Sequence, residues 1–365
     1  MVPTPAEVEM RTRSRLPLLA LAAPSAALAA ALAAPSAALA AAPLPVPADT
    51  PGTTPKEGVP YVFEGLLRVF GANRYETAAA ASRGSFTAGP GGAVFIASGA
   101  TAADALAAGP AAAAADAPLL LTAPTALPPA TAAELARLAP ATVHVVGGRS
   151  AVSDDVLAEI ATAAPAAVVV RIAGPNRYAT ATEVAETFFP DADAAVLSRG
   201  DDFPDALSGG ATAAAQGIPL LLTRPAALPP ATTAWLREHP LQRATVVGGT
   251  AAVTEETAAA LAEHVVGAGG VTRLAGTDRY STAATVAAAG FADATTVVLA
   301  TGDDFPDALA AVPVAAVNDA PLLLLPKTCT PVAVVERIAD LRIERTVVLG
   351  GPSAVPNEAL ATVCP

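Results

Sequence analysis

The chain has 365 residues, and its 33 acidic and 21 basic side chains give a formal net charge of −12. An acidic chain without a basic run argues against a nucleic-acid binder, which needs clustered Lys or Arg, and against a polybasic membrane contact. The net charge leaves open a polyanion bound by a local cluster of arginines. Hydrophobic residues make up 53% and aromatic residues 4%, which fits Ala-rich helices on short Val and Leu strands but decides little alone.

The N-terminal stretch has the pattern of a secretory signal peptide. Three arginines within 11–15 precede an apolar Leu- and Ala-rich segment over 16–34, and small residues after it offer cleavage sites. We therefore expect residues 1–42 to be a signal peptide, with translation starting at Met10 because two Glu precede that position. A membrane anchor is the alternative, but prolines interrupt the apolar segment. We expect a secreted protein without stable membrane insertion after cleavage.

The rest of the chain is organised by a threefold repeat. The pattern Arg-x-x-Gly-x-x-Arg-Tyr-x-Thr-Ala begins at Arg68, Arg171 and Arg273, at intervals of about 100 residues. Before it lies a Pro- and Thr-rich segment without hydrophobic periodicity, which predicts an extended linker. The expected boundaries are 43–58 for the linker and 59–165, 166–268 and 269–365 for the three repeats.

Repeat two shows the expected elements of one unit most clearly. Short β-branched or Leu-rich runs predict strands, while a leading Pro or Thr followed by Glu predicts the start of a helix. The expected strands are 167–172, 194–198, 218–223 and 243–247, and the expected helices are 177–189, 204–216, 231–238 and 254–265. This alternation predicts an α/β fold in which each unit has a parallel sheet covered by helices on both faces.

Three loops follow the expected strands, at the edge where parallel sheets meet ligands. They are the Gly-x-x-Arg-Tyr turn, the Gly-Asp-Asp-Phe-Pro-Asp loop and the Gly-Gly turn. Three equivalent edges would suit a repeating polymer, which gains avidity from several weak contacts. The candidate polymer-binding residues are Arg74, Tyr75, Arg177, Tyr178, Asp201, Asp202, Asp205, Arg279, Tyr280, Asp303, Asp304 and Asp307.

Each of these residues also has a purely structural interpretation. The tyrosines would be packed aromatics, the paired acids would cap a helix, and the Gly-Gly pair would only turn the chain. The arginines would form ion pairs within their own repeats: Arg74 with Asp104, Arg177 with Asp205, and Arg279 with Asp307. Repeat one keeps Asp104 but lacks the paired acids. If those acids bind a ligand, repeat one binds it poorly.

The sequence gives little support for catalysis. Its histidines, His144, His239 and His264, do not recur between repeats and do not form a metal-binding motif. No Ser lies in a Gly-x-Ser-x-Gly elbow, and no dinucleotide-binding pattern follows a first strand. Two carboxylates per loop are a weak basis for Mg²⁺ or Ca²⁺. We therefore expect no enzyme activity, no resident metal and no cofactor.

Both cysteines lie in the last repeat. In an exported chain, Cys329 and Cys364 are most simply one disulfide. The alternatives are a metal site, for which further ligands do not lie nearby in the sequence, and two unpaired thiols.

Taken together, the repeated motifs resemble a known family. The Arg-x-x-Gly-x-x-Arg-Tyr-x-Thr-Ala, Gly-Asp-x-Phe-x-Asp-Ala-Leu, Pro-x-Leu-Leu and Val-x-Gly-Gly patterns are similar to cell wall binding repeat type 2 of Gram-positive bacteria, over residues 59–365. The resemblance implies three tandem Rossmann-like modules with parallel sheets, packed as a pseudo-threefold trimer within one chain. It also implies non-covalent attachment to the cell wall through an anionic polymer. Its Pro-Leu-Leu-Leu motif falls at 118–121, 219–222 and 321–324, where the pattern predicts a buried strand.

These observations lead to one main hypothesis and two alternatives. The main hypothesis is a secreted, wall-associated protein without catalysis, whose partner is an anionic wall polymer or peptidoglycan. Family members are often joined to an effector, so the first alternative is a wall hydrolase, an N-acetylmuramoyl-L-alanine amidase, or its enhancer. The second alternative is a structural or adhesive surface protein.

Overall fold

The computed structural model describes residue 63 and residues 65–364. These residues belong to one compact unit, which spans 41–365. The predicted signal peptide over 1–42 and the predicted linker over 43–58 lie outside the described residues. Among the described residues, no helix is both long and apolar enough to span a membrane.

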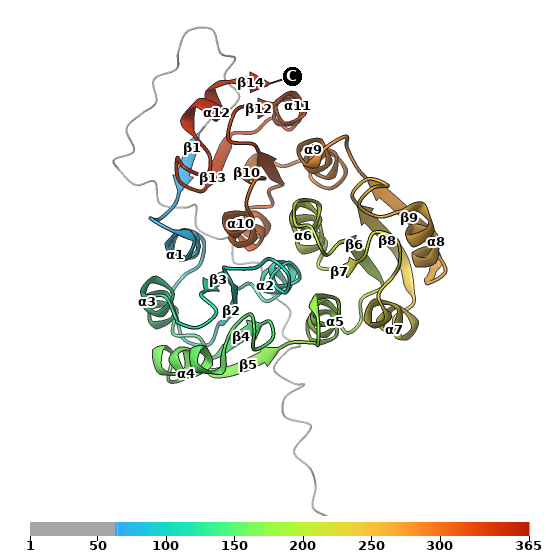
Figure 1. Ribbon diagram of the computed structural model, residues 1–365. Coiled ribbons are helices and arrows are strands. Elements are labelled where there is room, and N and C mark those ends of the chain that lie inside the picture. Colours follow the sequence, from blue (N-terminus) through green and yellow to red (C-terminus); the bar gives the residue numbers. More distant parts are fainter. Residues whose placement is uncertain (1–62, 64, 365) are drawn as a thin grey trace, which may run out of the picture. The chain divides into compact units, whose positions relative to one another are not determined.

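Three four-stranded parallel sheets form the framework, as the alternating pattern predicted (Figure 1). The first sheet has the order β3-β2-β4-β5 and the second has the order β7-β6-β8-β9. The strands of the first are β2 (Ala93–Ser98), β3 (Leu119–Thr122), β4 (Thr142–Val146) and β5 (Val168–Ile172). The strands of the second are β6 (Ala194–Arg199), β7 (Leu220–Thr223), β8 (Leu241–Val247) and β9 (Val265–Leu274).

The third sheet contains the first strand of the described chain. Its order is β1-β13-β10-β11, formed by β1 (Leu66–Val69), β10 (Thr296–Thr301), β11 (Leu322–Leu325) and β13 (Arg345–Leu349). A small additional sheet pairs β12 (Thr330–Pro331) with β14 (Val363–Cys364). The predicted disulfide between Cys329 and Cys364 is present beside this pair, with Cα atoms 5.4 Å apart.

Helices cover both faces of the sheets. Helices α1 (Arg74–Ser85), α5 (Arg177–Phe188) and α9 (Arg279–Gly290) each start with the Arg-Tyr pair. The helices that follow the second strand of each repeat are α2 (Ala108–Ala114), α6 (Pro204–Gln216) and α10 (Pro306–Val317). The outer helices are α3 (Pro129–Leu138), α4 (Asp154–Ala163), α7 (Pro230–Glu238), α8 (Glu255–Ala262), α11 (Val332–Asp340) and α12 (Asn357–Ala361).

The three modules share one apolar core. Helices α2, α6 and α10 pack against one another, and Figure 1 shows them converging between the sheets. Strand residues from all three sheets face this shared core. Examples are Phe95, Val196 and Leu299, which are all buried. The opposite strand faces pack on the outer helices, as Ile96 does in the first module. This is the pseudo-threefold arrangement expected from the resemblance.

Local signals placed most elements of repeat two correctly. Helix α6 begins at Pro204 and ends at Gln216, as predicted, because Pro suits the first helical turn. The Pro-Leu-Leu-Leu segments form the fully buried strands β3, β7 and β11, as predicted. Helix α8 ends at Ala262 rather than at 265, because strand β9 already begins at Val265. The first half of β9 was not predicted as a strand, because it contains glycines in place of the β-branched residues that predict strands.

The first strand of each repeat does not join the sheet of its own repeat, and here the prediction of four strands from one unit was wrong. Strand β5 pairs with β4 of the preceding unit, and β9 pairs with β8. Strand β1 closes the third sheet by pairing with β13. The sequence pattern of a buried parallel strand is the same whichever sheet it joins, so repetition alone did not decide this point.

Candidate functional site

Each Arg-Tyr turn is a rigid start of a helix. The residue before the Arg is the N-cap of α1, α5 or α9, and its side chain accepts hydrogen bonds from two backbone amides of the first turn. The Gly71 amide donates to Thr77 Oγ1 at 3.2 Å, and the Gly276 amide donates to Thr282 Oγ1 at 3.0 Å. A Cβ on either Gly would lie 2.2 Å from a side-chain atom of that helix, so only Gly fits. These contacts fix the direction of the Arg.

The Arg and the Tyr both contact the loop after the second strand of their own repeat. In each case the guanidinium donates to a Gly carbonyl: Arg74 to Gly99 at 2.5 Å, Arg177 to Gly200 at 2.6 Å, and Arg279 to Gly302 at 2.7 Å. A Cβ on these glycines would come within 2.7, 2.9 and 2.8 Å of the Tyr ring, so the Tyr packs where only Gly leaves room. The tyrosines are therefore packed aromatics.

On their other side, Arg74 and Arg279 contact a neighbouring module. Arg74 Nη2 lies 3.5 Å from Asp304 Oδ2, and the Arg74 guanidinium stacks 5.9 Å from the centre of the Phe305 ring. Arg279 stacks on Phe203 at the same distance. Both groups of the Arg74–Asp304 pair are substantially exposed, so the pair stabilises the fold by at most about 1 kcal/mol. The arginines thus connect neighbouring modules.

The predicted ion pairs within one repeat are wrong. None of the salt bridges of the described residues joins Arg177 to Asp205, and Arg74 pairs with Asp304 instead of Asp104. The reason is the strand exchange: each Arg follows a strand that belongs to the sheet of a neighbouring module. Consequently, Arg279 lies near Asp205.

The Asp of each Asp-Ala-Leu segment packs against the first Gly of the Gly-Gly turn. These glycines have left-handed backbone conformations, with φ of +127° at Gly147, +118° at Gly248 and +120° at Gly350. A Cβ would lie 2.6 Å from Asp205 Oδ2 at Gly248 and 2.8 Å from Asp307 Oδ2 at Gly350. Each Gly is therefore required by both its conformation and its neighbour.

Two of these carboxyls have perturbed acidity. Burial raises the pKa of Asp205, and nearby Asp202 adds to the effect while Arg279 and Arg199 oppose it. Burial, helped by the charge of Asp304, raises the pKa of Asp307 to about 6 against the opposing influence of Arg74 and a Thr77 hydrogen bond. Both carboxyls therefore resist ionisation more than an exposed Asp does.

The paired acids are largely engaged in local contacts. Asp202 and Asp304 each accept a hydrogen bond from the following Phe amide at 2.9 Å. Asp201 accepts one from Arg199, which lowers the pKa of Asp201. Asp303 accepts one from the Tyr280 hydroxyl at 3.0 Å, and burial together with this bond raises the pKa of Tyr280 to about 12.

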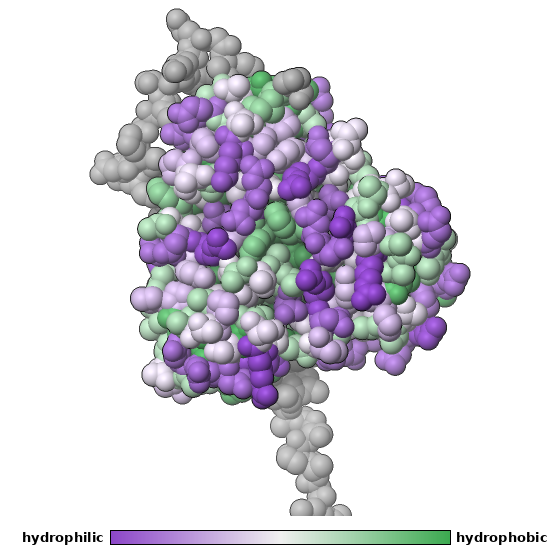
Figure 2. Space-filling view, in the orientation of Figure 1, coloured by the Kyte–Doolittle hydropathy of each residue, from purple (hydrophilic) through white to green (hydrophobic). Residues whose placement is uncertain are grey.

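The Phe of the acidic loop occupies the boundary between modules two and three. The rings of Phe203 and Phe305 meet edge to face, with centroids 5.9 Å apart. Repeat one has Ala102 at this place, and Ala103 where the others have Pro, so α2 begins only at Ala108. Figure 2 shows a largely polar face with an apolar patch near its middle, where α2, α6 and α10 converge in Figure 1.

Two cavities lie at the carboxyl edges of the sheets. The cavity at the second sheet, here the Arg279 pocket, has a volume of about 200 Å³, and its charged lining residues are Arg199, Asp202, Asp205, Asp278 and Arg279. The cavity at the third sheet, here the Arg74 pocket, has a volume of about 240 Å³, and its charged lining residues are Arg74, Asp304, Asp307 and Lys327. Each cavity is built from two neighbouring modules.

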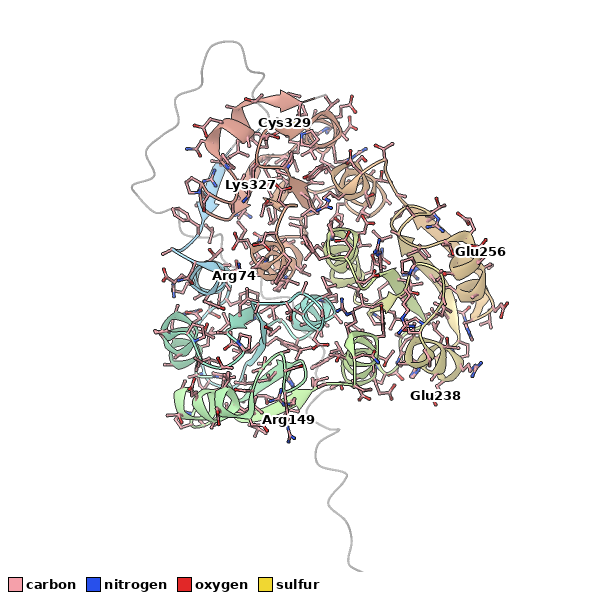
Figure 3. The ribbon with its side chains drawn as sticks, viewed as in Figure 1. Arg74, Arg149, Glu238, Glu256, Lys327 and Cys329 are labelled. Carbon is pink, nitrogen blue, oxygen red and sulfur yellow. A yellow bond between two sulfur atoms is a disulfide. The ribbon has the colours of Figure 1, made fainter. Side chains whose placement is uncertain are left out.

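Arg199 and Lys327 were not among the candidate residues predicted from the sequence. Arg199 is the last residue of β6, where the other repeats have Ser98 and Thr301. Lys327, labelled in Figure 3, follows β11 and lines the Arg74 pocket together with Gly71 and Gly351, which follow β1 and β13. Because neither residue recurs between repeats, a search for repeated residues could not identify them; their placement beside the strand ends was the available signal.

Within residues 63 and 65–364, no group of three His, Cys, Asp or Glu side chains is arranged to hold a metal ion. The acids of both pockets face arginines, which compete with a cation for the carboxylate oxygens.

Comparisons with known proteins agree with this architecture. The family model described as Cell wall binding domain 2 (CWB2) matches residues 68–157, 171–258 and 273–360. Among solved structures, Cwp6 from Clostridium difficile superposes with a TM-score of 0.74 at 26% identity, covering 83% of this chain and 48% of that chain. Cwp8 from the same organism gives a TM-score of 0.72 at 27% identity, covering 80% of this chain and 50% of that chain.

Two curated relatives come from Bacillus subtilis (strain 168). The first is N-acetylmuramoyl-L-alanine amidase LytC, which is 36% identical over 189 residues, or 52% of this chain and 37% of the relative. The second is an amidase enhancer, which is 27% identical over 291 residues, or 80% of this chain and 39% of the relative. The chain thus spans less than two-fifths of the length of either relative.

Proposed function

Because the chain belongs to the cell wall binding domain 2 family, which indicates cell wall binding, we propose that it is exported and attaches non-covalently to an anionic wall polymer. The proposed contact surface is the carboxyl edge of the three sheets. We further propose that the described residues carry out no catalysis of their own.

The observation that carries this proposal is that three similar sheet edges are arranged around one shared core. Each edge combines a Gly-Gly turn and an Asp from one module with an Arg-Tyr helix start from the next. A polymer with repeating units meets such edges several times. Several weak contacts on one rigid body then give a higher affinity than any single contact.

The net charge of −12 does not prevent binding of an anionic polymer, because local fields decide such contacts. The pockets bring cationic side chains to the edges, with Arg74 and Lys327 in one and Arg199 and Arg279 in the other. The adjacent carboxylates equal these cations in number in the Arg74 pocket and outnumber them in the Arg279 pocket. Burial raises the pKa of Asp205 and Asp307, so both carboxyls lose their charge more readily than an exposed Asp as the pH falls.

The positions of the histidines support a protein without catalysis. The His144 ring packs between Phe95 and Phe188, at 4.9 and 5.0 Å between ring centroids. Burial lowers the pKa of His144. His239 stacks on Trp235 at 4.3 Å. None of these contacts pairs a histidine with a nucleophile at a sheet edge, where we place the ligand.

The second candidate function is delivery of a wall hydrolase or its enhancer, favoured by the similarity to an amidase and to an amidase enhancer. In that case the modules described here would hold an enzymatic partner or a further domain at the wall. Release of soluble muropeptides by the purified chain would favour this candidate over simple attachment.

Sedimentation with purified walls tests the proposal. The purified chain should co-sediment with walls, with or without Ca²⁺, and the Arg177→Ala/Arg279→Ala variant should bind more weakly while melting cooperatively. Arg237→Ala is the matched control, because this exposed Arg lies on α7, away from both pockets. Failure of the native chain to co-sediment would refute wall attachment. If the double variant does not fold, these arginines serve the fold rather than the ligand.

A further inference from the structure

The two pockets differ in their charge. The Arg279 pocket contains two arginines and three carboxylates, since its helix N-cap is Asp278. The Arg74 pocket contains Arg74 and Lys327 but only two carboxylates, because the corresponding N-cap is Asn73. The Arg74 pocket is therefore the more favourable place for an anionic group.

The net charge of the Arg74 pocket depends on whether Asp307 is ionised. Its Oδ2 packs against Gly350, whose backbone allows the close approach. Arg74 and Thr77 face it from α1, Asp304 from the loop before α10, and Lys327 from the segment after β11.

Behind the Gly350 turn, Arg68 of β1 donates to the Gly350 carbonyl at 2.8 Å. The residues of this turn that line the pocket, Gly351, Ser353 and Ala354, carry no charge. Loss of the Asp307 charge would leave two cations against Asp304 alone.

We propose that the Arg74 pocket binds a phosphate or carboxylate group of the wall polymer, and that Asp307 takes up a proton when it does so. Binding then strengthens as the pH falls. This inference rests on the proposed wall attachment and assigns one of its edges a specific ligand group and a dependence on pH.

The physical basis is the coupling between two negative groups in one small cavity. Burial and Asp304 already raise the pKa of Asp307 to about 6, and an incoming anion raises it further. Asp307 is thus mostly ionised at pH 7.5 and mostly neutral at pH 5.5. Repulsion between an ionised Asp307 and an anion about 6 Å away weakens binding about tenfold at intermediate dielectric. The expected gain from pH 7.5 to pH 5.5 is therefore about fivefold.

The test measures binding of the full chain to purified walls at pH 5.5 and 7.5, at constant ionic strength. Poly(glycerol phosphate) and polygalacturonate serve as separate soluble probes, which distinguish a phosphate from a carboxylate ligand. The native chain should bind about fivefold more tightly at pH 5.5. Asp307→Asn, which imitates the protonated acid, should bind at pH 7.5 as tightly as the native chain does at pH 5.5, and should lose most of the pH dependence.

Two further variants make the result specific. Asp205→Asn changes the corresponding residue of the Arg279 pocket, where two carboxylates remain, and should keep the pH response. Lys327→Ala alters an exposed side chain and should weaken binding at both pH values while folding normally. The comparison of the native chain with Asp307→Asn carries the conclusion.

The outcomes separate the two proposals. No binding at either pH would remove the proposed attachment itself. Three results would overturn the role of the Arg74 pocket while leaving wall attachment intact. The first is wall binding that does not depend on pH. The others are a pH response that persists in Asp307→Asn and binding that Lys327→Ala does not weaken.

Discussion

Replacing Asp307 by Asn should make the protein more stable at neutral pH. The pKa of this carboxyl rises from 3.8 to about 6 on folding, because it is buried beside Asp304. The folded state therefore holds the proton more tightly than the unfolded state, so this group stabilises the fold most below pH 3.8 and loses that contribution as the pH rises through 6. The shift corresponds to at most about 3 kcal/mol at pH 7.5. Partial solvent access reduces the expected gain for Asp307→Asn to about 1–2 kcal/mol.

Urea denaturation at pH 7.5, 6 and 4.5 would measure this gain as a difference in the free energy of unfolding. The gain should shrink steadily as the pH falls, because the native carboxyl then becomes neutral itself. Asp104→Asn is the matched control, since Asp104 packs against Gly147 but has Thr101 where Asp307 has Asp304. A loss of stability at pH 7.5, or a gain that does not change with pH, would refute the reasoning. An equal pH-dependent gain in Asp104→Asn would show that the paired acid is not the cause.

Three other changes should also alter stability, each measured by urea denaturation. Glu134→Ala should cost about 1–3 kcal/mol, because the buried carboxylate accepts two hydrogen bonds from Arg137, at 2.6 and 2.9 Å, and one from the buried Ser82 hydroxyl. Glu134→Gln should cost less. Gly350→Ala should cost about 1–3 kcal/mol, because φ is +120° and a Cβ would meet Asp307. Cys329→Ser should cost about 3 kcal/mol through loss of the disulfide, and a chain equally stable after reduction would contradict this.

Much of the fold could be predicted because its signals are local. Helix α6 has a Pro in its first turn and a Gly with φ of +64° at its end, so both boundaries are visible in the sequence. The buried strands β3, β7 and β11 are short Leu runs, which the same motif marks in every repeat. In repeat one these signals are weaker, and α2 starts late because Ala103 stands where the other repeats have Pro.

The candidate site was less predictable because it depends on contacts between modules. The sequence located the Arg-Tyr turn, the acidic loop and the Gly-Gly turn at strand ends, but it did not determine which turn faces which loop. Arg74 and Asp304 are 230 positions apart in the numbering, and their contact exists only because β1 joins the third sheet. Lys327 and Arg199 occur once each, so repetition gave no reason to select them.

The exchange of strands also explains why the repeats work as a set. An isolated repeat would have its Arg-Tyr turn but not the Asp and Gly-Gly turn that complete a pocket, because those come from the preceding repeat. Its sheet would lack a fourth strand, since β5 and β9 reach back to the preceding sheets. In the third module, β1 and Arg74 of repeat one take the place that a strand and an Arg of the next repeat take in the other two modules. Each sheet thereby receives its fourth strand, and both pockets receive an Arg from a neighbouring module. The proposed binding edges therefore depend on the set of three modules together.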